Sequence, residues 1–333
     1  MRFSTPAGLA MALAIGACDD PATSDGTTDV AVDAADSAAP DTTGTTDTSV
    51  PDTSDDAAVD TSDDAAVDTV GDTSDSAEDT EELPLFSFFV TSLRAMQELS
   101  GSADGFGGDL RFGEEGPGAG LRGADLICAT IAEQSMPGAG KKQWRAFLSA
   151  VEGEDGQEVH AIDRIGEGPW YDRLGRLFAN AKSELLEDRP TDADAAIKND
   201  FPNEDGVPNH RPDPTQPAVD NHDFLTGSNE QGRLYNATAT CLSWTSGTGD
   251  KTLEGKPRVG HSWPRSGGPG GGGGGGGGGP GGDTNLANWI SALTESGCAP
   301  GVNLIEMGGP IASSNTVGSG GGYGGIYCFA LTP

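Results

Sequence analysis

Positive charge is missing from an early part of this chain. Residues 19–82 contain 21 Asp and Glu and no Lys or Arg, and the rest of the segment is mostly Thr, Ser and Ala. Such a segment cannot bury enough apolar surface to offset the entropy lost on ordering, so we predict a disordered acidic linker over residues 18–82. The chain of 333 residues carries a net charge of −33. This balance argues against the basic surface that nucleic-acid binding requires.

Long hydrophobic runs are missing as well. The apolar run at residues 7–17 is too short for a helix that spans a bilayer, which needs about 20 residues. Arg2 before this run and small residues at its end are typical of an export signal, predicted at residues 1–17. The residues before Cys18 also resemble a bacterial lipobox, which implies cleavage before Cys18 and lipidation of its thiol. The alternative is an ordinary secretory signal with an incidental cysteine.

Residues 83–333 are predicted to form one α+β domain with short antiparallel strands, one or two helices and long loops. Six prolines interrupt residues 187–223, and residues 267–282 consist of 14 glycines and two prolines, so both insertions are expected to be irregular. The hydrophobic pattern predicts a helix at 121–134. It predicts strands at 86–92, 144–149, 177–179, 224–226 and 326–331.

Cysteine is scarce, with five residues in the chain including Cys18. The other four are Cys128, Cys241, Cys298 and Cys328. An even number in an exported chain favours two disulfides, and four cysteines allow three pairings. A zinc site is the alternative, but no two of these residues have CxxC spacing, and thiols outside the cytoplasm become oxidised.

The order of these features resembles the C-type-lectin-like fold. A helix carries the first cysteine, a Trp-containing strand follows, two cysteines flank Trp-containing loops, and the last cysteine lies in a C-terminal strand. More narrowly, the chain resembles an uncharacterised, endostatin-related domain of bacterial surface lipoproteins. The matching segments are 89–92, 121–128, 144–149, 163–165, 168–171, 225–228, 241–246 and 326–329. The resemblance implies that Cys128 pairs with Cys328 and Cys241 with Cys298.

The resemblance does not extend to the usual calcium site. Sugar-binding relatives carry Glu-Pro-Asn or Gln-Pro-Asp before the second cysteine and Trp-Asn-Asp before the third. Here residues 216–218 are Gln-Pro-Ala and residues 288–290 are Asn-Trp-Ile. Asp220, Asn221 and Asp223, together with the intervening histidine, could supply oxygen ligands for calcium in a variant site. We favour an exposed polar loop, and expect no metal or cofactor.

Catalytic motifs are also absent. The four histidines, His160, His210, His222 and His261, are scattered among acidic residues, and no GxSxG motif accompanies them. Lone histidines are usually solvated or structural. Residues 118–123 match GxGxxG, but no hydrophobic strand leads into them, so these glycines are expected to form a helix entry. We therefore predict a protein that is not an enzyme.

Tryptophan is the residue type that suggests a binding surface. Trp144 and Trp244 fall within the matching segments, so we expect them to be buried beside the disulfides. Trp170, Tyr171 and Trp263 lie beside glycine, proline and polar residues, where an aromatic platform could meet a sugar or protein ligand.

Together these observations predict a lectin-like binding module that is anchored to a membrane through Cys18. Its ligand would be a glycan or an envelope protein. The alternative is a structural envelope lipoprotein that binds no small molecule. The expected location is the cell envelope, with the outer membrane or cell surface favoured over the periplasmic face of the inner membrane.

Overall fold

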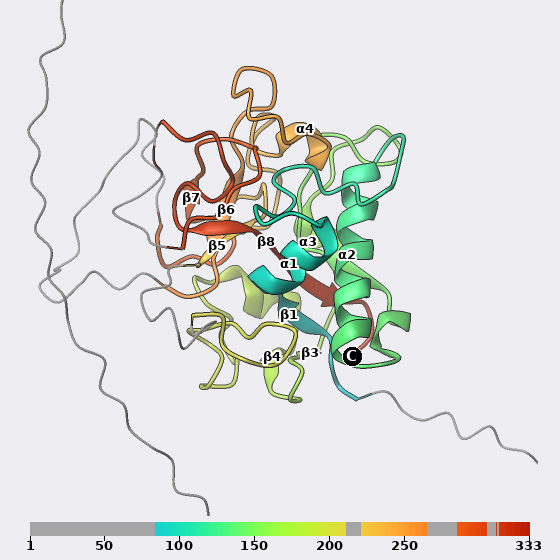
Figure 1. Ribbon diagram of the computed structural model, residues 1–333. Helices are drawn as coiled ribbons and strands as arrows, with labels where there is room; N and C mark the ends of the chain where they lie inside the picture. Colours follow the sequence, from blue (N-terminus) through green and yellow to red (C-terminus); the bar gives the residue numbers. More distant parts are fainter. Residues whose placement is uncertain (1–83, 211–220, 265–284, 305–310, 312) are drawn as a thin grey trace, which may run out of the picture. The chain divides into compact units, whose positions relative to one another are not determined.

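The computed structural model describes residues 84–210, 221–264, 285–304, 311 and 313–333 (Figure 1). The predicted signal, Cys18, the acidic linker, Asp220 and the Gly-rich insertion lie outside the described residues. Within the described part of the chain, no helix has the length and apolar character needed to cross a membrane.

A mixed sheet of short strands is built around the C-terminal strand β8. The sheet contains β1 (Phe88–Val90), β2 (Trp144–Ala146), β5 (Asp223–Leu225), β6 (Arg258–His261), β7 (Leu293–Thr294) and β8 (Gly322–Ala330). Strands β1 and β2 pair antiparallel with the second half of β8, whereas β5 pairs parallel with its first half. Strands β6 and β7 extend the sheet beyond β5. A separate hairpin joins β3 (Trp170–Tyr171) and β4 (Leu177–Ala179).

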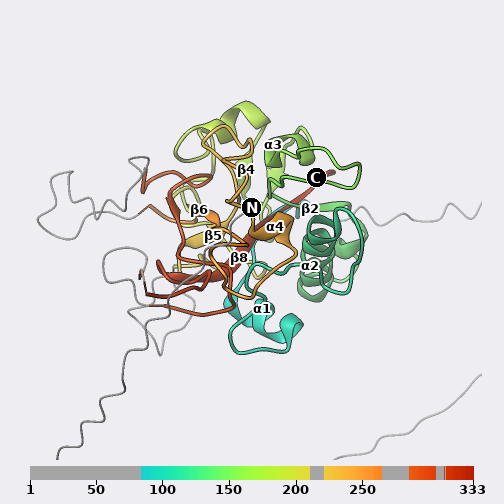
Figure 2. The ribbon, with the colours of Figure 1, turned by 90° about the horizontal axis from the view of Figure 1, so that it is seen from above.

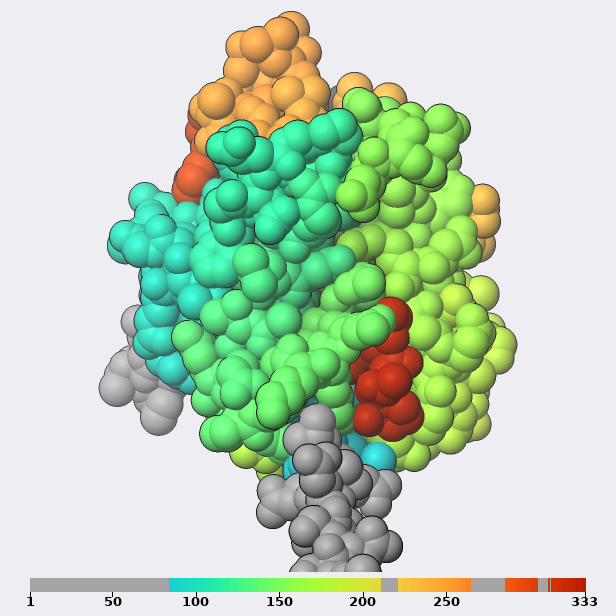
Figure 3. Space-filling model, turned by 90° about the vertical axis from the view of Figure 1, so that its right-hand side faces the viewer, coloured from blue at the N-terminus to red at the C-terminus, as the bar shows by residue number. Residues whose placement is uncertain are grey.

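The longest helix, α2, covers the sheet on the side away from β5 and β6 (Figures 1 and 2). The helical segments are α1 (Leu93–Ser100), α2 (Ala119–Ser135), η1 (Ala139–Lys141), α3 (Ala161–Arg164), η2 (Lys182–Leu186) and α4 (Cys241–Trp244). Ser92 caps α1 by accepting a hydrogen bond from the N–H of Ala95, and Gly101 ends this helix with φ 67°. Figure 3 shows the α2 segment in green beside the C-terminal end of the chain in red.

The glycines at the start of α2 have the structural role that we predicted. Gly118 precedes the helix with φ 72°, a left-handed conformation that glycine adopts without strain. Gly120 and Gly123 face the backbone carbonyls of Ser243 and Arg111 so closely that a Cβ would overlap them. The GxGxxG pattern therefore serves helix entry and close packing.

An aromatic core lies between the sheet and its covering segments, with Trp289 near its centre. The Trp289 ring lies 5.0 Å from Phe147, 5.2 Å from Tyr327 and 5.9 Å from Phe201, measured between centroids. Its Nε1–H donates to the carbonyl of Leu185 at 2.8 Å, so the polar atom of the buried ring is satisfied. Full burial of these large rings supplies much of the apolar stabilisation of the domain.

Two disulfides connect distant parts of the domain. Cys128 on α2 is bonded to Cys328 on β8, which fixes the helix to the central strand. Cys241 is bonded to Cys298. These are the pairs that the resemblance to the C-type-lectin-like fold implies.

The segment α4 is a left-handed turn rather than an ordinary helix. Cys241, Leu242, Ser243 and Trp244 have φ values of 49°, 56°, 56° and 65°. This conformation costs about 1–2 kcal/mol per residue for L-amino acids. The Cys241–Cys298 disulfide and a hydrogen bond of 3.2 Å from the N–H of Ser243 to Oγ1 of Thr240 hold the turn in place.

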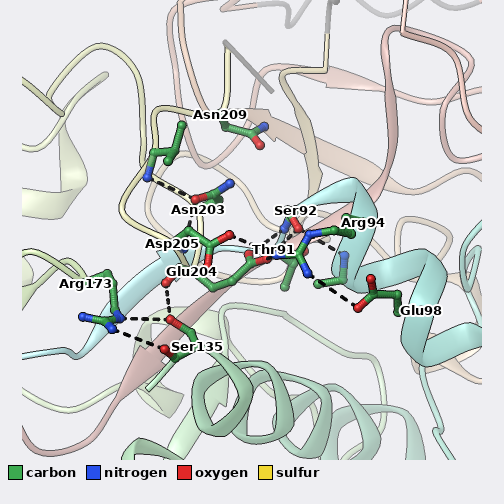
Figure 4. Close-up of polar contacts among 12 residues, drawn as sticks. Thr91, Ser92, Arg94, Glu98, Ser135, Arg173, Asn203, Glu204, Asp205 and Asn209 are labelled. Carbon is green, nitrogen blue, oxygen red and sulfur yellow. Dashed lines mark hydrogen bonds and ion pairs between the residues drawn. The ribbon is translucent and has the colours of Figure 1, made fainter. Parts of the chain in front are cut away.

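Glu204, in the Pro-rich region, forms hydrogen bonds at the start of α1 and at the end of α2 (Figure 4). Its carboxylate accepts hydrogen bonds from the N–H of Ser92 at 2.9 Å and from the Ser92 hydroxyl at 2.5 Å, at the start of α1. Its carbonyl accepts a hydrogen bond of 2.5 Å from the hydroxyl of Ser135, at the end of α2. Burial raises the pKa of Glu204 despite these donors. The contacts satisfy the carboxylate, so we assign Glu204 a structural role.

The predicted α+β class is confirmed, and the apolar strands were placed close to their observed positions. The helix predicted at 121–134 is α2. The sequence pattern did not indicate α1, β6 or β7. The prediction that prolines would exclude regular structure from 187–223 agrees with the described residues up to Asp223, where β5 begins.

Candidate metal centre

Four buried polar side chains converge where three strands of the sheet end. His222 and Asp223 lie at the start of β5, His261 ends β6, and Glu295 directly follows β7. Asp223 and His261 are direct partners in the antiparallel pair of β5 with β6. Side chains of such partners lie on the same face of a sheet, so strand pairing brings this carboxylate and this imidazole together.

The three side chains of His222, Asp223 and His261 are close enough to share one ligand. Nε2 of His261 lies 2.9 Å from Oδ1 of Asp223, and Nε2 of His222 lies 3.3 Å from the same oxygen. One donor atom from each residue can be chosen so that all three lie within 4.8 Å of one another. All three residues have 0% relative exposure. Two imidazoles and a carboxylate are a common ligand set for divalent transition metals.

The orientation of His261 is fixed by its other ring nitrogen. Nδ1 lies 2.8 Å from the carbonyl oxygen of Leu286. A carbonyl can only accept a hydrogen bond, so Nδ1 carries the hydrogen and Nε2 faces Asp223. Burial and the neighbouring His222 lower the pKa of His261, which favours the neutral ring with a lone pair on Nε2. This is the arrangement in which metal-binding histidines are held by an outer carbonyl.

Glu295 adds a second carboxyl group beside Asp223. Its Oε2 accepts hydrogen bonds from the hydroxyl of Ser319 and from the N–H of Gly320, the latter at 2.9 Å. Burial, and then the negative charge of Asp223, raise the pKa of Glu295 well above its ordinary value. Burial alone would raise the pKa of Asp223 too, but the two histidines outweigh it and lower this pKa. The cluster thus places two carboxyl groups beside two imidazoles, and all four side chains are buried.

Several polar atoms of this cluster lack hydrogen bonds among the described residues. They are both carboxylate oxygens of Asp223, Oε1 of Glu295 and Nε2 of His261. Nε2 of His261 nevertheless lies 2.9 Å from Oδ1 of Asp223, which is the distance of an ion pair. A buried polar atom without a hydrogen bond costs about 1–3 kcal/mol, and one ligand atom each from His222, Asp223 and His261 lies within 4.8 Å of the others. Their arrangement fits a bound cation.

Aromatic rings connect this cluster with the protein surface. The ring of Trp263 lies 4.7 Å from His222 and 4.4 Å from His210, measured between centroids. Trp263 is half-buried, whereas the side chain of His210 is 49% exposed. Trp263 therefore packs between the buried site and a surface histidine.

The predicted ligand-binding residues have different environments. Asp223 belongs to the cluster, and Trp263 lies beside it. Asn221 is buried, and its side chain donates 2.9 Å to the carbonyl of Asn209. Our preference for an exposed polar loop here was therefore wrong, because β5 pairs on both sides and carries Asn221, His222 and Asp223 into the interior.

The aromatic platform expected at Trp170 is also corrected. Trp170 is only 1% exposed, and its Nε1–H donates 3.1 Å to the carbonyl of Ala330. Tyr171 is half-buried, and its backbone pairs with Ser87. The turn residues of the β3–β4 hairpin do not expose the tryptophan, because its ring packs edge-on against Phe329.

The sequence analysis did not identify two members of this cluster. His261 was grouped with scattered histidines, and Glu295 was not considered. Both lie far from Asp223 in the sequence, and the strands that carry or precede them are only four and two residues long. The segment Arg258–His261 contains one apolar residue, Val259, so the local pattern did not identify it as a strand.

Comparison with known proteins adds no assignment. No protein-family model matches the chain, and no curated protein matches it at a significant level. The interpretation of the site therefore depends on its own geometry.

Proposed function

We propose that residues 83–333 form an extracytoplasmic binding module whose loop end is organised around one divalent metal ion. His222, Asp223 and His261 would hold the ion. The observation that carries this proposal is the convergence of three fully buried side chains that can ligate a metal, with one ligand atom from each within 4.8 Å of the others. Calcium is disfavoured because it takes 6 to 8 oxygen ligands, whereas two of these ligands are imidazole nitrogens.

The lectin-like fold and the anchor are further parts of the proposal. The two disulfide pairs and the antiparallel pairing of β1 with β8, which brings the first and last strands together, support a C-type-lectin-like domain. Lipidation of Cys18 would attach the protein to a membrane of the cell envelope. The acidic residues 19–82 would then act as a spacer, since like charges extend a disordered chain.

The metal would organise the loops rather than contact a glycan directly. The three proposed ligands have no exposed surface, so a sugar hydroxyl could not reach an ion held between them. A glycan or an envelope protein would instead be recognised by the surrounding surface. Trp263 and His210 are the described residues that join this surface to the site by ring contacts.

Metal analysis of the full chain tests the proposal. The protein should be purified under oxidising conditions, dialysed against a chelator, reloaded with zinc and passed through a desalting column. We expect close to one zinc ion per chain in the wild type, and loss of that ion in Asp223→Asn and His261→Ala. The exposed Asp205→Asn and the distant His160→Ala are matched controls that should retain it. Equal zinc content in all five proteins would overturn the proposal.

A glycan array with the zinc-loaded and the chelated protein tests the binding function. We expect glycan or protein binding to depend on zinc because the loops depend on it. Binding that is lost in Trp263→Ala while zinc is retained would place the ligand beside the site. Absence of any ligand from a broad glycan set would instead favour the structural envelope role.

A further inference from the structure

Three side chains in the described part of the chain can share one metal ion, and three are fewer than a zinc ion takes. His222, Asp223 and His261 form the group there whose ligand atoms all lie within 4.8 Å of one another. The four cysteines of this part cannot add a thiolate, because all of them are paired in disulfides. Zinc binds four ligands in proteins, and sites with three protein ligands bind water or another molecule at the fourth position.

The two oxygens of Asp223 face different partners. Oδ1 lies 3.3 Å from Nε2 of His222 and 2.9 Å from Nε2 of His261, so it is the oxygen on the side of the proposed ion. Oδ2 lies near Glu295, because a Cβ at Gly320 would be 2.6 Å from this oxygen and 3.2 and 3.4 Å from the carboxyl oxygens of Glu295. Glu295 thus meets Asp223 at the oxygen that the histidines do not approach, and it does not belong to the group that can share the ion.

Glu295 is held in this place by the segment before β8. Its Oε2 accepts hydrogen bonds from the Ser319 hydroxyl and from the N–H of Gly320, the latter at 2.9 Å. The Ser319 hydroxyl oxygen in turn accepts from the N–H of Ser296 at 2.9 Å. A carboxyl group that is fixed in this way supports Asp223 from outside the coordination sphere, as the outer partners of ligating carboxylates do.

The charge of the three ligands favours an anion as the remaining donor. Histidines bind metals as neutral rings, so two imidazoles and one carboxylate leave positive charge on a divalent ion. All three ligands have 0% relative exposure, and a buried charge is costly unless it is compensated. An anion bound directly to the ion reduces this cost. It must be small, because the ligand residues expose no surface to a larger molecule.

The indole of Trp263 provides a hydrogen-bond donor beside the site. Its ring lies 4.7 Å from the ring of His222, measured between centroids. Its Nε1 is buried and has no hydrogen-bond partner among the described residues. A metal ion cannot accept a hydrogen bond from this N–H, whereas a hydroxide or another anion on the ion has lone pairs that can. This unpaired donor therefore favours an acceptor that the described side chains do not supply.

We infer that the proposed ion keeps one coordination position for a small exchangeable anion, and that His222, Asp223 and His261 are its only protein ligands in the described part of the chain. This inference rests on the proposed function. The class of ligand is a monodentate anion of a few atoms, with hydroxide as the member that water itself supplies. The ion is then an anion-binding site as well as a cross-link between β5 and β6.

Cobalt substitution tests the open position directly. The full chain, with its disulfides intact, is chelated, loaded with Co²⁺ and titrated with azide and, separately, with thiocyanate. The visible spectrum of Co²⁺ changes when one of its ligands is replaced. We expect a saturable change with one anion bound per cobalt, and an unchanged cobalt content after desalting shows that the anion has not removed the metal.

Reciprocal coupling gives a second, quantitative readout. An anion that binds only the metal-loaded protein must raise the affinity for the metal by the same factor. At an azide concentration of about nine times its dissociation constant, the apparent zinc affinity at controlled free zinc should rise about 10-fold. The melting temperature of the zinc-loaded protein should rise with azide, and that of the chelated protein should not. Asp223→Asn is the matched variant that should show no azide effect.

Glu295→Gln separates an outer support from a metal ligand. Because Glu295 meets Asp223 rather than the ion, this variant should keep the shape of the cobalt spectrum and its response to azide. Its Co²⁺ affinity should fall by about 10–100-fold, the loss that is typical of outer partners. Circular dichroism checks the fold of each variant. A Glu295→Gln spectrum that differs in shape from the wild type would overturn the inference, because Glu295 would then occupy the fourth position.

The outcomes distinguish this inference from the proposed function. A wild type that binds Co²⁺ but whose spectrum does not respond to azide or thiocyanate would overturn the open position and leave the three-residue metal site standing. A zinc affinity that is the same with and without azide would do so as well. A wild type that binds neither Co²⁺ nor Zn²⁺ would overturn the proposed function itself.

Discussion

Removal of the metal ion should destabilise the folded domain by an amount that its affinity fixes in advance. The ion would bind the folded chain at His222, Asp223 and His261, which strand pairing brings together. The unfolded chain has no such arrangement, so it should bind the ion far more weakly. Thermodynamic linkage then converts metal binding into folding stability.

The size of this stabilisation depends on the ratio of the free zinc concentration to the dissociation constant for zinc. At a free zinc concentration of 100 times the dissociation constant, the stabilisation is about 2.7 kcal/mol. For a domain of 150–250 residues, 1 kcal/mol shifts the melting temperature by about 2–4 °C. Zinc at this ratio should therefore raise the melting temperature of the chelated protein by about 5–11 °C, with both disulfides intact throughout.

Two calorimetric measurements on the same preparation test this prediction. Isothermal titration of the folded protein gives the dissociation constant, and differential scanning calorimetry gives the melting temperature at several zinc concentrations. The rise should follow the logarithm of free zinc, and it should vanish in Asp223→Asn. Calcium should give no comparable rise. Tight zinc binding by titration with no rise in the melting temperature would refute the reasoning, because the ion would then bind elsewhere or bind both states equally.

Three further changes have expected outcomes. Gly320→Ala places a Cβ 2.6 Å from Oδ2 of Asp223, so we expect zinc affinity to fall at least about 10-fold while circular dichroism is unchanged; unaltered affinity would contradict the placement of the carboxyl groups. Trp289→Ala removes the centre of the aromatic core and should cost about 3–5 kcal/mol in urea unfolding, whereas Leu253→Ala, at an exposed position, should cost little. Burial raises the folded-state pKa of Glu204, so its contribution to stability is complete below the unfolded pKa of about 4.3 and is lost as pH rises through the higher folded value. In thermal melts, Glu204→Gln should therefore lower the melting temperature more at pH 4 than at pH 7. A loss that is equal at the two pH values, or larger at pH 7, would contradict a raised pKa for Glu204.

The parts of the fold that could be predicted are those with strong local signals. The aromatic and β-branched residues of β1 and the end of β8 indicated strands, and the apolar spacing of 121–134 indicated α2. Helix α1 was missed although it carries good end signals, a capping Ser92 and a left-handed Gly101. It follows β1 after only two residues, so its apolar residues continued the strand pattern.

The short strands β6 and β7 could not be identified from local pattern. Arg258 and His261 are polar residues that are buried because they lie between other strands, and neither position stands out as apolar in the sequence. The left-handed turn of α4 could not be predicted either, because non-glycine residues rarely adopt positive φ and here four of them do so in succession. Tertiary contacts, including the Cys241–Cys298 disulfide, stabilise this conformation against that preference.

The candidate site shows why a metal centre can be invisible in a sequence. Asp223 was considered as an oxygen ligand, but its segment was expected to be exposed because polar loops usually lie on the surface. Burial changes the interpretation: a solvated Asp and His need no partner, whereas the same groups in the interior need a hydrogen bond or an ion. That burial depends on pairing between β5, β6 and β8, which no local motif encodes.

The energetic balance of the buried cluster is the strongest general reason to expect a cation in it. A buried polar atom without a hydrogen bond costs about 1–3 kcal/mol, a sizeable share of the stability of a typical domain, about 5–15 kcal/mol. Such atoms in this cluster are both oxygens of Asp223, Oε1 of Glu295 and Nε2 of His261. A divalent ion held by His222, Asp223 and His261 would satisfy all three residues at once, because each would direct a lone pair at a positive charge. The folding stability of the domain would then depend on the bound ion, and chelation followed by reloading measures this dependence.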